Sequence, residues 1–305
     1  NDLVLSELHL IANNSYQGFE AQKLHLLFQA TYYLNSGNYK SAIRYYQELI
    51  NLFNDNQHLI LNPPIYYLSA IQGILDSLCI AGLYHETPFF LSKLEELTQN
   101  EYSTEFILHL KTLIYIYKSN SLLQAGNFEQ ALELRDKQEN ELLKKVTSLG
   151  LESQLRLYLS FAVLGMYTKD YVQARKYMKK IFSLGKLFCA FPSYKIARLV
   201  NLLLQAELGN YDFFENEIIS IKRNIRFEKQ TYITEKLIFK FIQGYPLPSY
   251  EKARNKRWLQ YQKDIQKIEQ DKYERQLLKT FDVLAWIESK LTQRSLADIF
   301  IEKAH

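Results

Sequence analysis

The sequence predicts an all-α protein in which antiparallel helix pairs stack into an α-α superhelix. Three observations lead to this prediction. The 305 residues include only 10 Gly and 6 Pro, which favours long helices over a β-fold with many turns. Apolar residues recur at helical spacing on both sides of short turn phrases. The chain also exceeds the size at which one globular core stops growing, so an elongated repeat array is favoured.

The turn phrase recurs five times. In its first form, residues 37–42, Gly37 ends a helix by adopting the left-handed conformation, Asn38 suits a tight turn, and Ala42 lets two helices approach closely. Each repeat is therefore predicted to be a helix, a tight turn and a second helix. The aromatic residues of the phrase are 45, 44, 43 and 40 residues apart, at Tyr39, Tyr84, Phe128, Tyr171 and Tyr211.

Breaker residues divide the chain into an array and an end piece. Asn62-Pro63-Pro64 is expected to open a helix, and a stretch with two Pro that begins at Gly244 ends the regular array. We therefore expect about five repeats over residues 1–245 and a charged helical cap over residues 246–305. Within this cap, residues 249–292 are expected to form two long helices, because a repeat array needs a terminal element with a polar outer face.

The phrase Gly-x-aromatic-x-x-Ala resembles the turn signature of the tetratricopeptide family, over about residues 19–228. The residues 281–290 also resemble the ending of bacterial tetratricopeptide proteins. The family period is about 34 residues, so the repeats here are elongated and degenerate, and Thr87-Pro88 and Phe214 stand where two of the Ala are expected. The resemblance implies a tetratricopeptide-like solenoid, in which the first helices of the pairs line a concave face that holds a ligand.

The resemblance also implies which side chains line this groove. Asn and Gln amides can hydrogen-bond a peptide backbone as donor and acceptor, and Arg156 supplies one cation for an acidic ligand group. The alternative is that these side chains form ordinary polar helix surface or satisfy one another across repeats. The Lys and Arg of the family's clamp for a C-terminal carboxylate have no counterpart here. We expect the ligand or partner site in the middle of the concave face, at Gln72, Asp76, Asn120, Gln124, Arg156 and Tyr167.

Charge divides the chain unevenly. Residues 1–168 carry 11 Lys and Arg against 17 Asp and Glu, whereas residues 169–305 carry 26 against 16. A basic stretch with aromatic residues could meet phosphates and stack on bases. However, its two aromatic residues belong to an apolar stripe and acids dilute its charge, so a solvated face or capping helix is the competing interpretation. The stretch consists of Lys252, Arg254, Lys256, Arg257, Trp258, Tyr261 and Lys263.

No motif for catalysis, cofactor binding or metal binding is present. The six His form no metal-ligand spacing, and phosphate-binding loops and nucleophile elbows are absent. No apolar run is long enough for a transmembrane helix. The start of the chain lacks the positive region of a signal peptide, and two isolated Cys indicate no disulfide framework, so we expect a cytoplasmic protein without cofactors.

The leading interpretation is therefore a non-catalytic scaffold or adaptor that binds a protein or peptide in its concave face. The alternative is a nucleic-acid-binding or regulatory protein that uses the basic C-terminal half.

Overall fold

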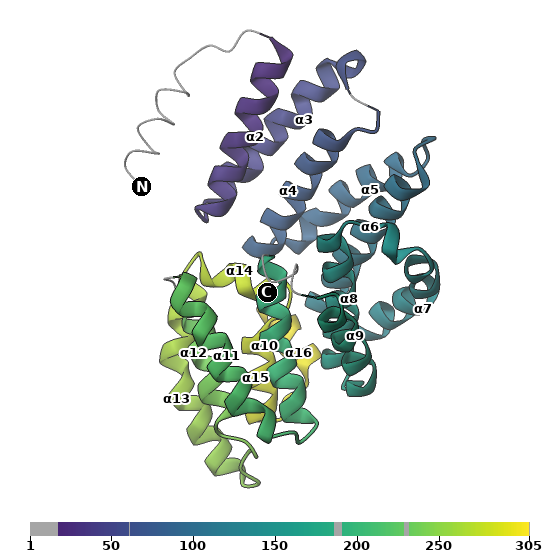
Figure 1. Cartoon of the computed structure of the whole chain (residues 1–305). Coiled ribbons are helices and arrows are strands. Elements are labelled where there is room, and N and C mark those ends of the chain that lie inside the picture. The colour runs from purple at the N-terminus through teal and green to yellow at the C-terminus, as the bar shows by residue number, and fades with distance from the viewer. Residues whose placement is uncertain (1–17, 61, 186–190, 229–231, 305) are drawn as a thin grey trace. The chain divides into compact units, whose positions relative to one another are not determined.

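The computed structural model describes residues 18–60, 62–185, 191–228 and 232–304, and it divides the chain into two compact units (Figure 1). The first unit is Asn1–Ser103 and the second is Thr104–His305. The described residues form 15 α-helices and three short 3-10 helices, and no strand occurs among them. The expectation of an all-α protein is confirmed.

The described residues of the first unit form four α-helices, each of which packs against the next. α4 begins directly after Asn62-Pro63-Pro64, as predicted, because Pro fits the start of a helix but not its interior. Short 3-10 turns at Gln57–Leu59 and Tyr84–Glu86 lie in two of the connections. The helices are α2 (Phe19–Asn35), α3 (Tyr39–Asp55), α4 (Ile65–Ala81) and α5 (Thr87–Leu97).

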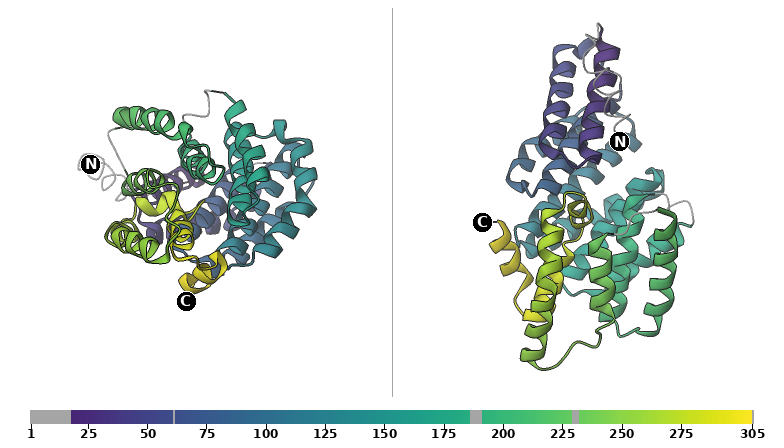
Figure 2. Two further views of the ribbon diagram at one scale, coloured as in Figure 1. Left: turned by 90° about the horizontal axis from the view of Figure 1, so that it is seen from below. Right: turned by 90° about the vertical axis from the view of Figure 1, so that its left-hand side faces the viewer.

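The second unit contains the remaining helices. Its first six helices are three pairs, each joined by one turn phrase, and the following helices complete its core (Figure 2). The pairs are α6 (Thr104–Gln124) with α7 (Phe128–Lys144), α8 (Leu151–Tyr167) with α9 (Tyr171–Ser183), and α10 (Pro192–Glu207) with α11 (Asp212–Glu228). The others are α12 (Ile233–Ile242), α13 (Glu251–Gln270), α14 (Glu274–Leu278), α15 (Val283–Thr292) and α16 (Leu296–Ala304).

The turn phrases adopt the predicted left-handed conformation. Gly37, Gly82, Gly126 and Gly209 have φ angles of 75°, 77°, 74° and 74°. Lys169 holds this place in the fourth phrase and has a φ of 61°, although it carries a Cβ. The residue after it then starts the next helix: Asp170 Oδ1 accepts a hydrogen bond from the backbone N–H of Gln173 at 3.1 Å.

Small residues allow the helix pairs to approach closely, as the sequence predicts. Ala42 and Ala174 are fully buried at the crossings. A Cβ added at Gly165 of α8 would lie 2.9 Å from the backbone nitrogen of Ala174, which would push α9 away. In the first unit, a Cβ at Gly73 of α4 would lie 2.2 Å from the ring of Tyr46. Glycine at this position therefore makes room for a buried tyrosine of α3.

The C-terminal region differs from the expected cap. Instead of two long helices over residues 249–292, α13 is followed by the shorter helices α14, α15 and α16. Asp282 starts α15 by accepting a hydrogen bond from the backbone N–H of Ala285 at 2.9 Å, and Gln293 ends α15 in the left-handed conformation. The compact units divide after Ser103 rather than at residue 246. The reason is that the C-terminal region joins the core of the second unit, where Trp286 is fully buried.

Candidate functional site

The six predicted site residues fall in both units. Gln72 and Asp76 lie on α4 of the first unit and are half-buried. The other four lie in the second unit, Asn120 and Gln124 on α6, and Arg156 and Tyr167 on α8. Because α4, α6 and α8 are all first helices of their pairs, each of these residues lies on the type of helix that the prediction specified.

In the second unit, the chain itself covers part of the predicted groove. We define the C-terminal segment as residues 279–303. The Asn120 Nδ2 atom donates a hydrogen bond to the backbone carbonyl of Lys279 at 3.2 Å. The turn at Gly126 also meets this segment, because a Cβ there would lie 3.0 Å from the carbonyl oxygen of Ala297. This amide therefore bonds a backbone carbonyl of its own chain.

The sequence predicts Tyr167 to be a ligand contact, but in the structure this residue is buried and holds the fold together. Its ring stacks on that of Phe281 with centroids 5.0 Å apart and meets Phe300 edge-on at 5.3 Å. Its hydroxyl oxygen accepts a hydrogen bond from the backbone N–H of Asp282 at 2.6 Å. Only 3% of the residue is exposed, so a ligand has no access to it. The physical reason is that the C-terminal segment packs on this end of α8.

A polar cluster attaches the same segment to α9 and α10. The Lys290 ammonium forms an ion pair with Glu207 and lies 2.9 Å from the Tyr171 hydroxyl oxygen. Tyr171 and Tyr245 both donate hydrogen bonds to the Glu207 carboxylate, at 2.5 and 2.8 Å. Burial raises the pKa of both tyrosine hydroxyls, and the neighbouring carboxylate raises it further. Glu207 is therefore engaged within the fold.

Arg156 also has partners within the second unit. Its Nη2 atom donates a hydrogen bond to the Tyr117 hydroxyl at 3.1 Å, and its guanidinium lies 5.6 Å from the centre of that ring. Burial lowers the pKa of the nearby His109, and the positive charge of Arg156 lowers it further. Gln124 is half-buried near the end of α6. These contacts favour the alternative in which polar groove residues satisfy one another.

The corresponding surface of the first unit is different. We define the α2/α4 face as a set of residues at helical spacing along α2 and α4, the first helices of the first two repeats. Leu24 and Phe28 lie one turn apart on α2 and are 55% and 47% exposed, and Ile65 at the start of α4 is 51% exposed. The Lys23 ammonium lies 4.3 Å from the centre of the Tyr66 ring, so the first turns of α2 and α4 are neighbours. The α2/α4 face comprises Leu24, Phe28, Thr31, Asn35, Ile65, Ser69, Gln72 and Asp76.

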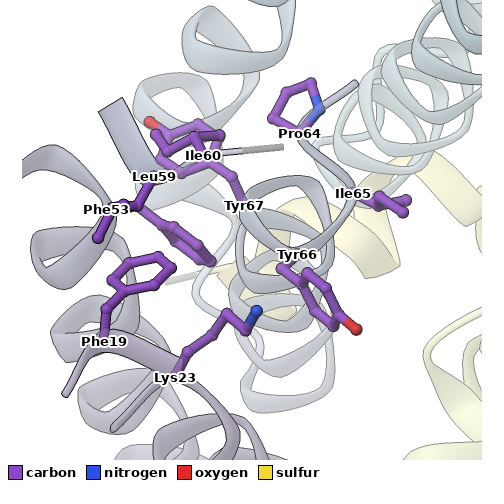
Figure 3. A pocket seen from close by; sticks show the side chains of 9 residues that line it. All are labelled: Phe19, Lys23, Phe53, Leu59, Ile60, Pro64, Ile65, Tyr66 and Tyr67. Carbon is purple, nitrogen blue, oxygen red and sulfur yellow. The ribbon is translucent and has the colours of Figure 1, made fainter. Parts of the chain in front are cut away.

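A pocket beside this face is filled by a lysine side chain rather than open to a ligand. Figure 3 shows Lys23 reaching between the rings of Phe19, Phe53 and Tyr66. Its ammonium lies 2.5 Å from the Glu20 carboxylate, and the pocket leaves only about 10 Å³ for the centre of a water molecule. That space suits at most one water molecule. The aromatic surroundings therefore stabilise the lysine by cation–π contact and hold no further group.

A larger cavity of about 390 Å³ lies between α11 and α12 of the second unit. Its lining combines apolar side chains with Lys222, Gln243 and two tyrosines. No pattern in the sequence indicates this cavity, because the apolar residues of α11 have the ordinary spacing of a packed helix. The lining residues are Tyr211, Phe214, Ile218, Ile219, Lys222, Ile242, Gln243 and Tyr245.

The basic stretch of α13 separates into buried and exposed residues. Arg254 is buried and donates hydrogen bonds to the carbonyls of Pro248 and Ser249, and Arg257 donates one to the carbonyl of Gly244. The aromatic residues are also unavailable for base stacking, since Tyr261 is buried and Trp258 packs against the core. The exposed members are Lys252, Lys256 and Lys263.

The described residues contain neither a candidate membrane span nor a candidate metal cluster. None of their helices combines the length and the apolar character that crossing a membrane requires. Within the same residues, no three or more His, Cys, Asp and Glu side chains gather as they would around a metal ion. Comparisons of the chain with models of known families, with curated proteins and with solved structures find no significant match.

Proposed function

We propose that this protein is a non-catalytic scaffold, a tetratricopeptide-like solenoid that holds a segment of a partner protein on the α2/α4 face. The repeated turn phrase with its left-handed residue and the buried small residues at the crossings support the solenoid. The proposal includes a cytoplasmic location, which the absence of a disulfide framework favours.

The observation that carries the proposal is the way the second unit holds its own C-terminal segment. First helices of two repeats grip that segment through one amide-to-carbonyl hydrogen bond, from Asn120, and one stacked aromatic ring, that of Tyr167. The α2/α4 face belongs to the equivalent helices of the first two repeats, and it presents exposed Leu24, Phe28 and Ile65 beside polar side chains. Such a mixture suits a peptide, because apolar anchors give affinity and polar groups fix orientation.

Charge indicates what kind of partner fits. Residues 1–103 carry 4 Lys and Arg against 10 Asp and Glu, and Asp76 lies at one end of the face. A partner segment with apolar anchors and basic side chains would therefore be attracted to this unit, and its approach would be faster at low salt. We propose that Asp76 receives one of these basic groups and that Phe28 is the main apolar anchor.

The test is selection of peptides from a displayed random library against the whole protein, followed by measurement of their affinity for variants. We expect the selected peptides to be basic and apolar. The double variant Leu24→Gln/Phe28→Gln should weaken their binding by about tenfold or more, because large apolar anchors dominate such interfaces. Both side chains are exposed, so the melting temperature should change little.

The matched control is Phe89→Gln/Val172→Gln, which removes two other exposed apolar side chains, 61% and 78% exposed. Selected peptides should bind this control as tightly as the wild-type protein. The proposal is wrong if the peptides bind the α2/α4 variant with unchanged affinity, or if the control variant loses as much affinity.

A further inference from the structure

The outer side of α13 carries a line of lysines. Lys252, Lys256, Lys263 and Lys267 are separated by four, seven and four residues. At 100° per residue, these steps keep all four within one narrow stripe along the helix. All four are exposed, and α13 lies at the edge of the second unit in Figure 1 and Figure 2. From Lys252 to Lys267 the stripe rises by 15 residue steps, which is about 22 Å of helix.

The acids that dilute this stretch in the sequence do not lie on the stripe. Glu251, Asp264 and Glu269 are rotated by roughly 90° or more from the line of the lysines. Asp264 faces α12, where its carboxylate lies 3.9 Å from the Lys240 ammonium. Within the described parts of the chain, no carboxylate lies within 4 Å of the four stripe lysines. Their positive charges are therefore concentrated on one face rather than neutralised.

The other residues of the stripe indicate which polyanion fits. Gln260 and Gln266 are exposed and supply amide donors for phosphate and sugar oxygens. Leu259 is the one large apolar side chain exposed on the stripe, which is too little for the apolar core of a protein interface, where lysine is also depleted. Tyr250, next to the start of α13, is 80% exposed. An exposed ring two residues before Lys252 is the kind of side chain on which unpaired bases stack.

We propose that the outer face of α13 binds single-stranded nucleic acid, with the four stripe lysines on successive phosphates and the Tyr250 ring against a base. Binding is independent of sequence, because no side chain of the stripe is held in place to read base edges. The charge of the second unit supports this proposal. Residues 104–305 carry 33 Lys and Arg against 23 Asp and Glu, and this net positive charge attracts a polyanion. This surface is separate from the α2/α4 face.

The test uses the whole protein and a fluorescent single-stranded oligonucleotide of mixed sequence, with anisotropy recorded between about 50 and 200 mM NaCl. Each phosphate contact on a single strand contributes about −0.7 to the slope of log K against log salt, so four lysines predict a slope of about −3. The variant K252Q/K256Q/K263Q/K267Q should weaken binding by about tenfold or more at the lowest salt, with a slope close to zero. Tyr250→Leu should weaken it by about tenfold without changing the slope.

The control K40Q/K137Q/K144Q/K145Q removes four exposed lysines from other helices and changes the net charge equally. It should retain affinity and slope within about twofold. The proposal is overturned if the wild-type protein does not bind, if the control loses as much affinity as the stripe variant, or if polyglutamate displaces the oligonucleotide at equal charge concentration. The last result would assign the stripe to an acidic protein instead. Circular dichroism melting verifies that both variants fold.

Discussion

At the scale of single residues, the turn phrases show how local chemistry determines backbone conformation. Four of the five phrases place Gly at the left-handed position, where a Cβ would clash with the following carbonyl. The fourth phrase uses Lys169 at a φ of 61°. Its side chain is exposed, so packing contributes little to offset this strain. The turn between α8 and α9 is therefore less stable than it would be with Gly, which the other four phrases carry at this position.

Lys169→Gly should stabilise the second unit by about 1 kcal/mol, because the strain of a left-handed non-glycine residue is removed. Thermal unfolding followed by circular dichroism measures the effect. Lys179→Gly is the opposite control, since Lys179 is exposed in the interior of α9 and glycine there should destabilise by about 1 kcal/mol. A lower melting temperature for Lys169→Gly would contradict the account of strain.

At the scale of elements, the C-terminal segment determines which side chains of α6 and α8 remain exposed to solvent. It covers Tyr167 and accepts the Asn120 amide, so these two side chains hold the fold together. The hydroxyl of Tyr167 is the partner of a backbone N–H of Asp282, just where α15 begins. A buried N–H group without a hydrogen-bond acceptor destabilises the folded state, because the same group is hydrogen-bonded to water in the unfolded chain. The Tyr167 hydroxyl is therefore one of the contacts that hold the segment, and the only acceptor for this N–H among the described residues.

Tyr167→Phe should destabilise the second unit by about 1–3 kcal/mol, because it leaves the Asp282 N–H unsatisfied while the stacked ring remains. Hydrogen exchange should show faster exchange at the start of α15. The matched control is Tyr158→Phe on the same helix, whose hydroxyl makes no hydrogen bond to any described residue although the residue is 6% exposed. Equal losses of stability in the two variants would show that the Tyr167 hydroxyl has no special role.

At the scale of the whole molecule, the two units carry opposite charge. The net charge is −6 for residues 1–103 and +10 for residues 104–305, from the counts of 4 against 10 and 33 against 23. Each unit also contains a histidine whose pKa is lowered. Burial lowers the pKa of His25 in the first unit, against the opposing effect of Glu48, and burial followed by the charge of Arg156 lowers that of His109 in the second.

These histidines predict a loss of stability in mild acid. A lowered native pKa means that the unfolded chain binds protons first as the pH falls below about 6.5, the ordinary histidine value. The free energy of unfolding should therefore decrease as the pH falls from about 6.5 toward the lowered native pKa values. Urea unfolding at a series of pH values measures this slope. His25→Gln/His109→Gln should flatten it, whereas His58→Gln/His85→Gln, at two exposed positions, should leave it unchanged.

The sequence by itself determined the helices, the five turn phrases and the small residues at the crossings. These features depend on few neighbours: a left-handed turn needs Gly37 or its equivalents, and a close crossing needs Ala42 or Ala174. It also placed the polar groove residues on first helices. The tetratricopeptide-like superhelix and the partner-binding function remain predictions.

Only the tertiary structure decided which of those residues are accessible. Tyr167 and Asp282 are 115 positions apart, and no periodicity in either segment indicates that they meet. Likewise, the acids near Lys256 weaken the basic stretch in the sequence, and only the orientation of α13 shows which of its sides faces solvent. Helix formation is largely local, whereas burial is decided by where distant segments pack. That is why the helices could be predicted and the free surfaces could not.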